Sequence, residues 1–388
     1  MTEVALNDIA EITSSKRIFY SDYVDDGIPF YRSREIINLD NGEDLKELIF
    51  ITQEKYQDIK NKFGAPTKND ILITSVGTIG NTYLVREEDE FYFKDGNLTW
   101  LRRWKDNVEP KFVLYWIKSP VGQGELYSQL IGSSQKALTI SALKKIKINL
   151  PPLPTQRKIA SILSAYDDLI ENNLKRIKLL EEKAFASYKL IVQNEKLEKI
   201  SVFDYAEIMS GGTPSTTNPN FWEGEIPFFT PKDLSSQSGY YLDDTERKIT
   251  ELGLEKCNSR LFPRDTIFIT ARGTVGKLVL AKIPTAISQS NYAVTTRNGS
   301  SNYFLFLALI DKIDHFKQLA VGGVFDTIIV DTFKMIFLEL PNETVINQFN
   351  IDIKPVFQLI DTLQKQNTKL REARDILLPR LMNGQIEV

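Results

Sequence analysis

The 388-residue sequence is poor in the residues that most catalytic and metal sites need. It contains one cysteine, Cys257, and one histidine, His315, which excludes an internal disulfide, a cysteine zinc site and a histidine cluster. His315 lies in a predicted helix, and Cys257 has no histidine or basic cluster beside it that would activate its thiol. We therefore expect an inert, buried Cys257, and neither a catalytic constellation nor a bound metal in this chain.

Long apolar runs and an excess of basic charge are also missing. The longest apolar run covers residues 303–310, well short of the roughly 20 residues that a membrane helix needs. Without such a run or a signal-peptide pattern, the sequence predicts a cytoplasmic protein that does not contact membranes. The formal net charge of −3 argues against a simple polycationic DNA binder. If the chain binds DNA, its basic residues must be locally arranged, or a partner must supply much of the phosphate neutralisation.

The sequence is, in contrast, rich in internal repetition. Residues 71–80, ILITSVGTIG, return 196 positions later as IFITARGTVG, and IPFY at 28–31 returns as IPFF at 226–229. A strand-like segment ending in proline, Pro151 or Pro341, precedes a helical stretch in each half. This order predicts a duplicated protein in which each mixed domain is followed by a helix.

The predicted fold class is α+β, with two pseudo-repeated mixed α/β domains separated by an antiparallel two-helix coiled-coil spacer. We predict domain 1 at residues 1–150, the first helical segment at 151–195, domain 2 at 196–340 and the second helical segment at 341–388.

Two heptad seams predict the coiled coil, because their apolar residues alternate in steps of four and three. The predicted seam positions are Ile159, Leu163, Tyr166, Ile170, Asn173, Ile177 and Leu180 in the first helix, and Val356, Ile360, Leu363, Asn367 and Leu370 in the second. One asparagine in each seam is typical of a position that fixes register. Each helix could also pack only on its own domain, but two matching seams favour pairing. The long part of the second helix is predicted from Pro355 to Leu378, with Pro379 ending it.

Polar loops beside the strands are the candidate binding elements. The repeated Gly-Thr-x-Gly turn is typical of a tight hairpin, and it could equally present backbone amides to a ligand. Side chains that read base edges or hold phosphates gather in six short runs, although such runs are also common in solvated loops. The runs are 14–17, 31–34, 133–136, 210–215, 230–233 and 288–291.

Several of these segments together match a known family. They are SSQKALTISALKKIKINLPPLPTQRKIASIL (133–163), the two Gly-Thr-x-Gly turns, GGTPSTTNPNFWEGEIPFFTPKDL (211–234) and LREARDILLPRLMNGQIEV (370–388). With these segments the chain resembles, along essentially its whole length, the specificity subunit of a Type I restriction-modification system. It departs from the pattern at residues 340–344, LPNET, where a PPLPTQ-like helix entry would be expected.

The resemblance implies two target-recognition domains that each read one half of a split, asymmetric double-stranded DNA sequence. It also implies that the helices set the spacing of the half-sites and dock two modification (methyltransferase) subunits. Members of this family have no activity of their own. S-adenosylmethionine is then expected on the modification subunits, and ATP and Mg on two restriction subunits, with no cofactor bound by this chain.

Loop composition and repeat position select the candidate DNA contacts. They are Lys16, Arg17, Arg32, Arg34, Thr78 and Gln135 in the first half, and Ser215, Lys232, Arg272, Thr274, Gln289 and Asn291 in the second. The alternative hypothesis is a non-DNA coiled-coil scaffold that joins two protein-binding domains. A hydrolase that uses carboxylates is a weaker third hypothesis.

Overall fold

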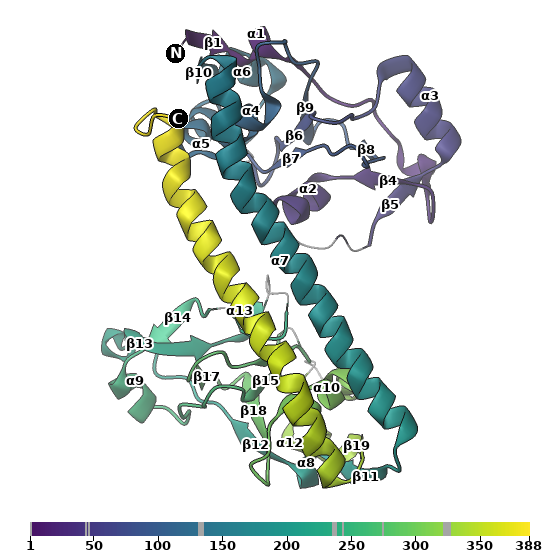
Figure 1. The fold of residues 1–388 in the computed structure, drawn as a ribbon, viewed down its shortest axis with the longest axis vertical. Coiled ribbons are helices and arrows are strands. Elements are labelled where there is room, and N and C mark those ends of the chain that lie inside the picture. Colours follow the sequence, from purple (N-terminus) through teal and green to yellow (C-terminus); the bar gives the residue numbers. More distant parts are fainter. Residues whose placement is uncertain are drawn as a thin grey trace. The chain divides into compact units, whose positions relative to one another are not determined.

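The chain divides into two compact units, which are described separately (Figure 1). The computed structural model describes residues 2–42, 45, 47–130, 136–234, 239–242, 244–273, 275–320 and 327–388. Unit 1 comprises Met1–Glu171 and Lys369–Val388, and unit 2 comprises Asn172–Thr368. Each unit therefore contains one mixed domain and parts of two long helices.

In unit 1, strands form one two-stranded pair and two four-stranded sheets. The pair joins β1 (Thr2–Ala5) to β10 (Lys147–Leu150). The first sheet has the order β2 (Glu11–Thr13), β9 (Leu98–Arg102), β6 (Ile71–Thr74), β7 (Thr82–Leu84). The second has the order β3 (Tyr23–Val24), β5 (Ile49–Ile51), β4 (Ile28–Tyr31), β8 (Tyr92–Phe93).

Short helices surround these strands. They are α1 (Leu6–Ile9), the 3-10 turn η1 (Tyr20–Asp22), α2 (Ser33–Asp40), α3 (Gln53–Phe63), α4 (Pro110–Lys118), α5 (Pro120–Ser128) and α6 (Ile140–Lys145). Local sequence sets their ends. The Thr52 hydroxyl accepts a hydrogen bond from the Lys55 N–H at the start of α3, and Gly64, at a φ of 87°, follows its last residue.

Unit 2 repeats the arrangement. Its strand pair joins β11 (Glu198–Ser201) to β19 (Phe337–Leu340). The first sheet has the order β12 (Ala206–Ser210), β18 (Asn291–Thr296), β15 (Ile267–Thr270), β16 (Leu278–Leu280). The second has the order β14 (Arg247–Ile249), β13 (Trp222–Phe229), β17 (Ala286–Ile287). The helices are α8 (Val202–Tyr205), η2 (Pro219–Phe221), η3 (Pro231–Leu234), α9 (Glu251–Glu255), α10 (Tyr303–Asp311), α11 (Ile313–Ala320) and α12 (Val330–Met335).

Strand pairing shows that the two domains share one topology. β6 lies between β9 and β7 in unit 1, as β15 lies between β18 and β16 in unit 2. The parallel pairing of β4 with β8 recurs as the parallel pairing of β13 with β17. The predicted duplication and the α+β class are confirmed.

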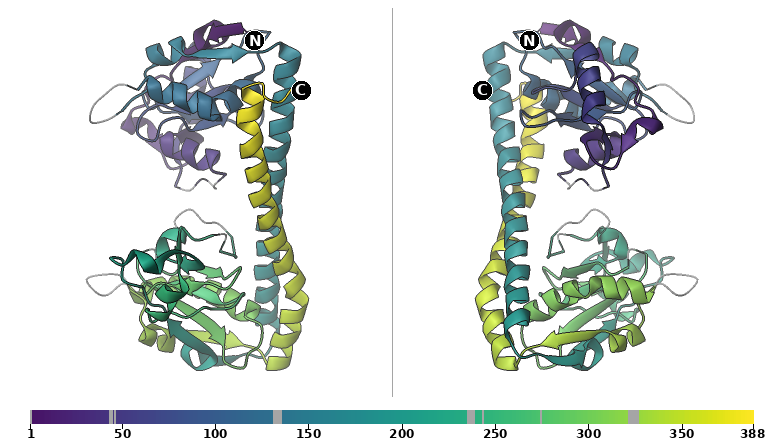
Figure 2. Two further views of the ribbon diagram at one scale, coloured as in Figure 1. Left: turned by 90° about the vertical axis from the view of Figure 1, so that its left-hand side faces the viewer. Right: turned by 90° about the vertical axis from the view of Figure 1, so that its right-hand side faces the viewer.

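The long helices α7 (Leu153–Asn194) and α13 (Glu343–Met382) complete both cores. In unit 1, Ile159 and Leu163 from the start of α7 join Leu378 and Leu381 from the end of α13 in one buried cluster. Both views in Figure 2 show these two stretches, teal and yellow, side by side. In unit 2 the end of α7 packs instead with the start of α13. Within each unit the two helices are thus antiparallel, as predicted.

The second long helix begins earlier and ends later than the sequence predicts. α13 runs without a break through Pro355 and Pro379, although proline in a helix interior costs about 3 kcal/mol. Buried neighbours offset this cost: Ile353 and Phe357 lie on either side of the exposed Pro355. The helix ends instead before Gly384, which has a φ of 69°.

Candidate nucleic-acid interface

The repeated Gly-Thr-x-Gly turn joins neighbouring strands in both units with the same hydrogen bonds. The Gly80 N–H donates to the Thr74 carbonyl oxygen at 3.0 Å, and the Gly276 N–H donates to the Thr270 carbonyl at 2.9 Å. Gly77 and Gly80 have φ values of 81° and 92°, in the region that favours glycine. These glycines therefore fix a tight hairpin, one of the two interpretations of the motif.

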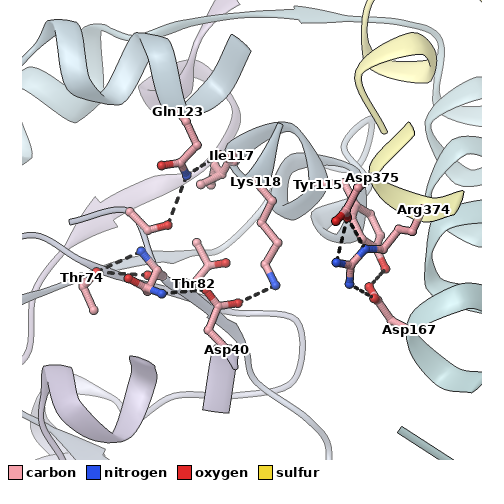
Figure 3. A network of polar contacts seen from close by, with 12 residues as sticks. Asp40, Thr74, Thr82, Tyr115, Ile117, Lys118, Gln123, Asp167, Arg374 and Asp375 are labelled. Atoms are coloured by element: carbon pink, nitrogen blue, oxygen red, sulfur yellow. Dashed lines mark hydrogen bonds and ion pairs between the residues drawn. The ribbon is translucent and has the colours of Figure 1, made fainter. Parts of the chain in front are cut away.

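A polar network holds this turn in unit 1 (Figure 3). The Asp40 carboxylate accepts hydrogen bonds from the Asn81 side-chain amide and the Thr82 N–H, both at 3.2 Å, and pairs with Lys118 at 2.6 Å. Gln123 donates to the Gly80 carbonyl at 3.3 Å. The turn is thus tied to α2, α4 and α5, which leaves Thr78 exposed at its tip.

In unit 2, four loops predicted to bind DNA converge at the end of β13. The Ser288 N–H donates to the Phe229 carbonyl at 2.9 Å, and the Ala271 N–H donates to the Ser290 carbonyl at 2.8 Å. The Gln289 N–H lies 3.4 Å from the Thr213 hydroxyl, which brings the loop after β12 to the same place. Residues 211–215, 230–233, 271–273, 275–276 and 288–291 therefore share one loop surface, which we call surface 2.

Unit 1 gathers the corresponding loops. The Ser14 hydroxyl donates to the Leu98 carbonyl at 3.0 Å, and the Lys94 N–H donates to the Tyr31 carbonyl at 2.8 Å. The Ser75 N–H donates to the Asn97 carbonyl at 2.8 Å. We call the loops at 14–17, 31–34, 75–80 and 94–97 surface 1.

The predicted residues of surface 1 differ in their availability. Lys16 and Arg17 are exposed; the Lys16 ammonium lies over the Phe63 ring, and Arg17 Nε contacts Asp95 at 2.9 Å. Arg34 is about half exposed and pairs with Glu47 at 3.2 Å. Gln135 lies outside the described residues. Four of the predicted residues, Lys16, Arg17, Arg34 and Thr78, thus have surface positions.

Arg32 has a structural role at the start of α2. Its backbone N–H donates to the Glu35 carboxylate at 2.7 Å, and its guanidinium donates to the same carboxylate, also at 2.7 Å. Burial alone would raise the pKa of Glu35, but the Arg32 hydrogen bonds outweigh it and hold that pKa below its ordinary value. Glu35 is 1% exposed, so removing Arg32 would leave a buried, poorly compensated charge.

The predicted residues of surface 2 are exposed at four positions. Ser215, Lys232, Arg272 and Gln289 are all exposed, and Lys232 pairs with Glu246 at 2.7 Å. Thr274 lies outside the described residues.

The DNA contact predicted for Asn291 does not fit its position. Asn291 is 1% exposed, and its side-chain amide donates to the Phe229 carbonyl and the Ser288 hydroxyl, at 3.2 and 2.8 Å. The side chain therefore supports the loop from behind instead of facing solvent.

Each surface has a basic residue at an equivalent position, Arg34 after β4 in unit 1 and Lys232 after β13 in unit 2. In unit 2 the Asp233 carboxylate accepts from the Thr230 N–H at 2.6 Å, as Glu35 accepts from the Arg32 N–H in unit 1. This shared cap presents Arg34 and Lys232 at the same place in each repeat.

Sequence reasoning missed a stacked cation near surface 2. The Arg247 guanidinium lies 3.5 Å from the centre of the Trp222 ring, and the Trp222 indole N–H donates to the Ser215 carbonyl. An arginine and a tryptophan 25 residues apart carry no local sequence signal, because strand pairing between β13 and β14 brings them together.

The predicted seam residues line the long helices as follows. Ile159, Leu163, Ile170, Ile177, Ile360 and Leu363 are buried, whereas Tyr166, Leu180, Val356 and Leu370 are half-buried. In unit 2 the Asn173 side-chain amide donates to the Asn367 side-chain oxygen at 2.9 Å, and both residues are buried. Phe357, fully buried beside Val356, was not predicted.

Buried amides attach each domain to the start of the helix that follows it. Gln156 of α7 accepts from the Glu109 N–H at 2.9 Å, just before α4. Asn350 of α13 accepts from the Phe304 N–H at 2.9 Å, in the first turn of α10. In unit 1 the Arg374 guanidinium adds an ion pair with Asp167 at 2.6 Å, and the Tyr115 hydroxyl donates to the same carboxylate (Figure 3).

No candidate for metal or nucleophilic chemistry emerges among the described residues. They contain no group of three or more His, Cys, Asp or Glu side chains that could hold a metal ion. His315 is exposed on α11, and Cys257 is half-buried, less enclosed than predicted. None of the described helices is both long and apolar enough to cross a bilayer.

Two copies of one domain, with loop surfaces of different sequence and two long helices, define a protein with an internally duplicated two-domain architecture. The chain belongs to the family described as Type I restriction modification DNA specificity domain, whose model matches residues 1–182 and 194–372.

Individual relatives agree with this assignment. The MjaIX specificity subunit of a Type I restriction enzyme from Methanocaldococcus jannaschii is 29% identical over 171 residues, which cover 44% of this chain and 40% of that protein. The chain thus matches less than half the length of this relative. A putative MjaX specificity subunit from the same organism is 24% identical over 392 aligned residues, covering 93% of this chain and 88% of that one. The crystal structure of a Type I S subunit from M. genitalium has the same fold, with a TM-score of 0.61 at 18% identity over 98% of this chain and 95% of that one.

Proposed function

We propose that this chain selects the DNA sequence on which a Type I restriction-modification complex acts. Domain 1 reads one half of a bipartite, asymmetric target through surface 1, and domain 2 reads the other half through surface 2. The observation that carries the proposal is the repetition of one scaffold with two different sets of polar loops. A shared scaffold presents loops in the same way, and different side chains on it select different bases.

The charge distribution supports a complex over a chain that acts alone. Surfaces 1 and 2 expose cations such as Lys16, Arg17, Lys232 and Arg272, but acidic residues balance the basic ones, and the chain as a whole carries a net charge of −3. Phosphate contacts dominate affinity for DNA, so partner subunits would supply much of the neutralisation. We propose two modification subunits docked on the helices, and restriction subunits beyond them.

Catalysis belongs to the partners in this proposal. S-adenosylmethionine would bind to the modification subunits, and ATP and magnesium to the restriction subunits, with no cofactor on this chain. Because genomic DNA is the proposed ligand, we also propose a cytoplasmic location. The purified chain alone is expected neither to methylate DNA nor to hydrolyse ATP, measured by methyl transfer and phosphate release.

Domain exchange tests the two-reader proposal. Residues 1–150 are replaced by the first domain of another family member, and adenine methylation is mapped by sequencing DNA from cells that make the complete complex. One half of the target is expected to change while the other half stays the same. Simultaneous change of both halves, or of neither, would contradict the proposal.

Competition binding tests the alternative of a protein scaffold. The complex is bound to a labelled duplex that carries the mapped site, and random-sequence duplexes compete. Strong preference for the mapped site is expected; equal competition by random duplexes would favour the scaffold.

A further inference from the structure

Two neighbouring aromatic side chains of unit 1 are largely exposed. Phe19 is 61% exposed and Tyr20 is 88% exposed, whereas the preceding Ile18 is buried. Exposed aromatic pairs are unusual on a protein surface that contacts only water, since their apolar area is left in solvent. Two exposed aromatic rings of this kind are suited to bind a ligand that has an apolar, flat face.

The turn that carries these side chains is held in place. The Asp22 carboxylate accepts a hydrogen bond from the Phe19 N–H at 3.0 Å and pairs with Lys55 at 3.2 Å. The hydrogen bond from Phe19 is the main reason that the pKa of Asp22 lies below its ordinary value. The Tyr20 ring also meets the Tyr23 ring edge-on, with centroids 5.6 Å apart. A fixed turn loses little conformational entropy when a ligand binds to it.

Cations on the same loop indicate the class of ligand. Lys16 and Arg17 are exposed and immediately precede the aromatic turn. The Lys16 N–H donates to the Tyr92 hydroxyl at 2.8 Å, and the Ser14 hydroxyl donates to Leu98, so the loop is continuous with surface 1. Asp25 and Asp26 are exposed in the turn after β3 and would repel phosphates there. Phosphates are therefore expected on the side of Lys16 and Arg17.

Unit 2 has no such pair at the corresponding place. The 3-10 turn η2 has Asn218 and Pro219 where η1 has Phe19 and Tyr20. The nearby Trp222 is half-buried, and the Arg247 guanidinium lies 3.5 Å from its ring centre. The aromatic turn is thus a property of one domain and not of the shared scaffold.

We propose that Phe19 and Tyr20 form an aromatic wedge that stacks against the bases of the first half-site while Lys16 and Arg17 contact the adjoining phosphates. This inference rests on the proposed function and adds a second way of reading DNA, through the ease with which a base step unstacks. Apolar side chains inserted at a base step kink the duplex and select flexible steps without hydrogen bonds to base edges.

The test uses the complete complex and duplexes that carry the target mapped by methylation. 2-Aminopurine replaces successive bases of the first half-site, because its fluorescence rises when its stacking is disturbed. Binding of the unaltered complex is expected to raise fluorescence at one step of the first half-site. The double variant Phe19→Ala, Tyr20→Ala is expected to lose this signal and to bind roughly tenfold or more weakly, as stacking on an aromatic side chain contributes about that much per base.

Two further variants sharpen the result. Tyr20→Phe keeps the ring and is expected to keep the signal, which separates stacking from a hydrogen bond of the hydroxyl. Leu252→Ala, which removes an apolar side chain that is 43% exposed in unit 2, is the control for lost surface area and should leave signal and affinity unchanged. A thermal melt of each variant checks that it folds.

The outcomes separate the wedge from the proposed function. If the unaltered complex binds its site selectively and the double variant matches it in affinity and fluorescence, the wedge is refuted and the proposed function stands. Loss of subunit assembly in the double variant, seen by size-exclusion chromatography, would assign the pair to a protein contact and also overturn the wedge. Absence of selective binding by the unaltered complex would overturn the proposed function itself.

Discussion

Single buried polar side chains decide where several loops lie, and Asn291 is a clear case. Its amide reaches the Phe229 carbonyl, 62 residues away in the sequence, and the Ser288 hydroxyl. A run of Ser, Gln and Asn suggests a solvent-exposed loop. Composition does not reveal which of its side chains is buried. Asn291 begins β18 and pairs with Thr270 of β15, whereas Gln289 lies two residues earlier, outside the strand, and is exposed.

Asn291→Ala should therefore lower stability, and Gln289→Ala should not. Loss of the amide leaves the Phe229 carbonyl buried with a partner missing, which costs about 1–3 kcal/mol in the free energy of unfolding. Gln289→Ala, on the exposed face of the same loop, is expected to stay within about 0.5 kcal/mol. Urea denaturation measures both. Equal effects of the two variants would contradict the burial of Asn291.

Glu181 should make the stability of unit 2 depend on pH. Burial raises the pKa of Glu181 from 4.5 to about 7, although the Tyr240 N–H donates to its carboxylate at 2.8 Å. Between these two values the folded state binds more protons than the unfolded state, so stability falls as the pH rises. The slope of the free energy of unfolding is at most about 1.4 kcal/mol per pH unit for one group. Glu181→Gln should remove this slope between pH 5 and 7, measured by denaturation at several pH values. An identical slope in the variant would count against the assignment.

At the scale of elements, the long helices were predictable and their ends were not. The heptad pattern indicates which face of α7 is buried, because apolar residues at this spacing lie on one side of the helix. Pro355 and Pro379 suggest breaks, since local preference disfavours proline in a helix interior. Packing of Phe357, Leu378 and Leu381 into the cores outweighs that preference, and such packing depends on residues far away in the sequence.

The asparagine pair of the long helices offers a test by double-mutant cycle. Asn173→Leu or Asn367→Leu alone leaves the other buried amide without its partner, at a cost of about 1–3 kcal/mol. The double variant replaces both amides with apolar side chains and should be close to the original chain in stability, or above it. Thermal denaturation of the four chains gives the coupling energy. Additive losses in the double variant would show that the 2.9 Å contact carries no coupling.

For the whole molecule, duplication was the most predictable feature and the binding surfaces the least. Repeated motifs such as the Gly-Thr-x-Gly turn mark equivalent strands because the same backbone geometry needs the same glycines. Surfaces 1 and 2 are made of loops that differ in sequence and meet through long-range backbone contacts. Composition can identify Lys16 or Arg272 as candidate DNA contacts. It cannot show that Arg32 instead binds Glu35 at the start of α2.

Helix length should control the preferred spacing of the half-sites. Adding seven residues to α7 and seven to α13 at matched positions keeps the heptad seams aligned and lengthens each helix by about 10 Å. The two half-sites should stay the same while their spacing grows by about three base pairs, at ~3.4 Å each. Methylation mapping on a library of randomised spacer lengths measures this.

Insertion of four residues at the same positions is the control. It breaks the seams, so it should mainly destabilise the chain. An unchanged spacing preference in a folded, active seven-residue variant would contradict the role of the helices as a ruler.

The first and last strands of each domain are partners, and this has a consequence for how new specificities arise. Thr2 of β1 lies opposite Leu150 of β10, and Glu198 of β11 lies opposite Leu340 of β19. The chain therefore enters and leaves each domain through neighbouring strands, roughly 5 Å apart. A recombination event that crosses over at both strands would import a whole foreign domain as a cassette, with its core intact and both junctions in one small sheet. Under the proposed function, such an exchange would give the gene a new half-target in a single genetic event.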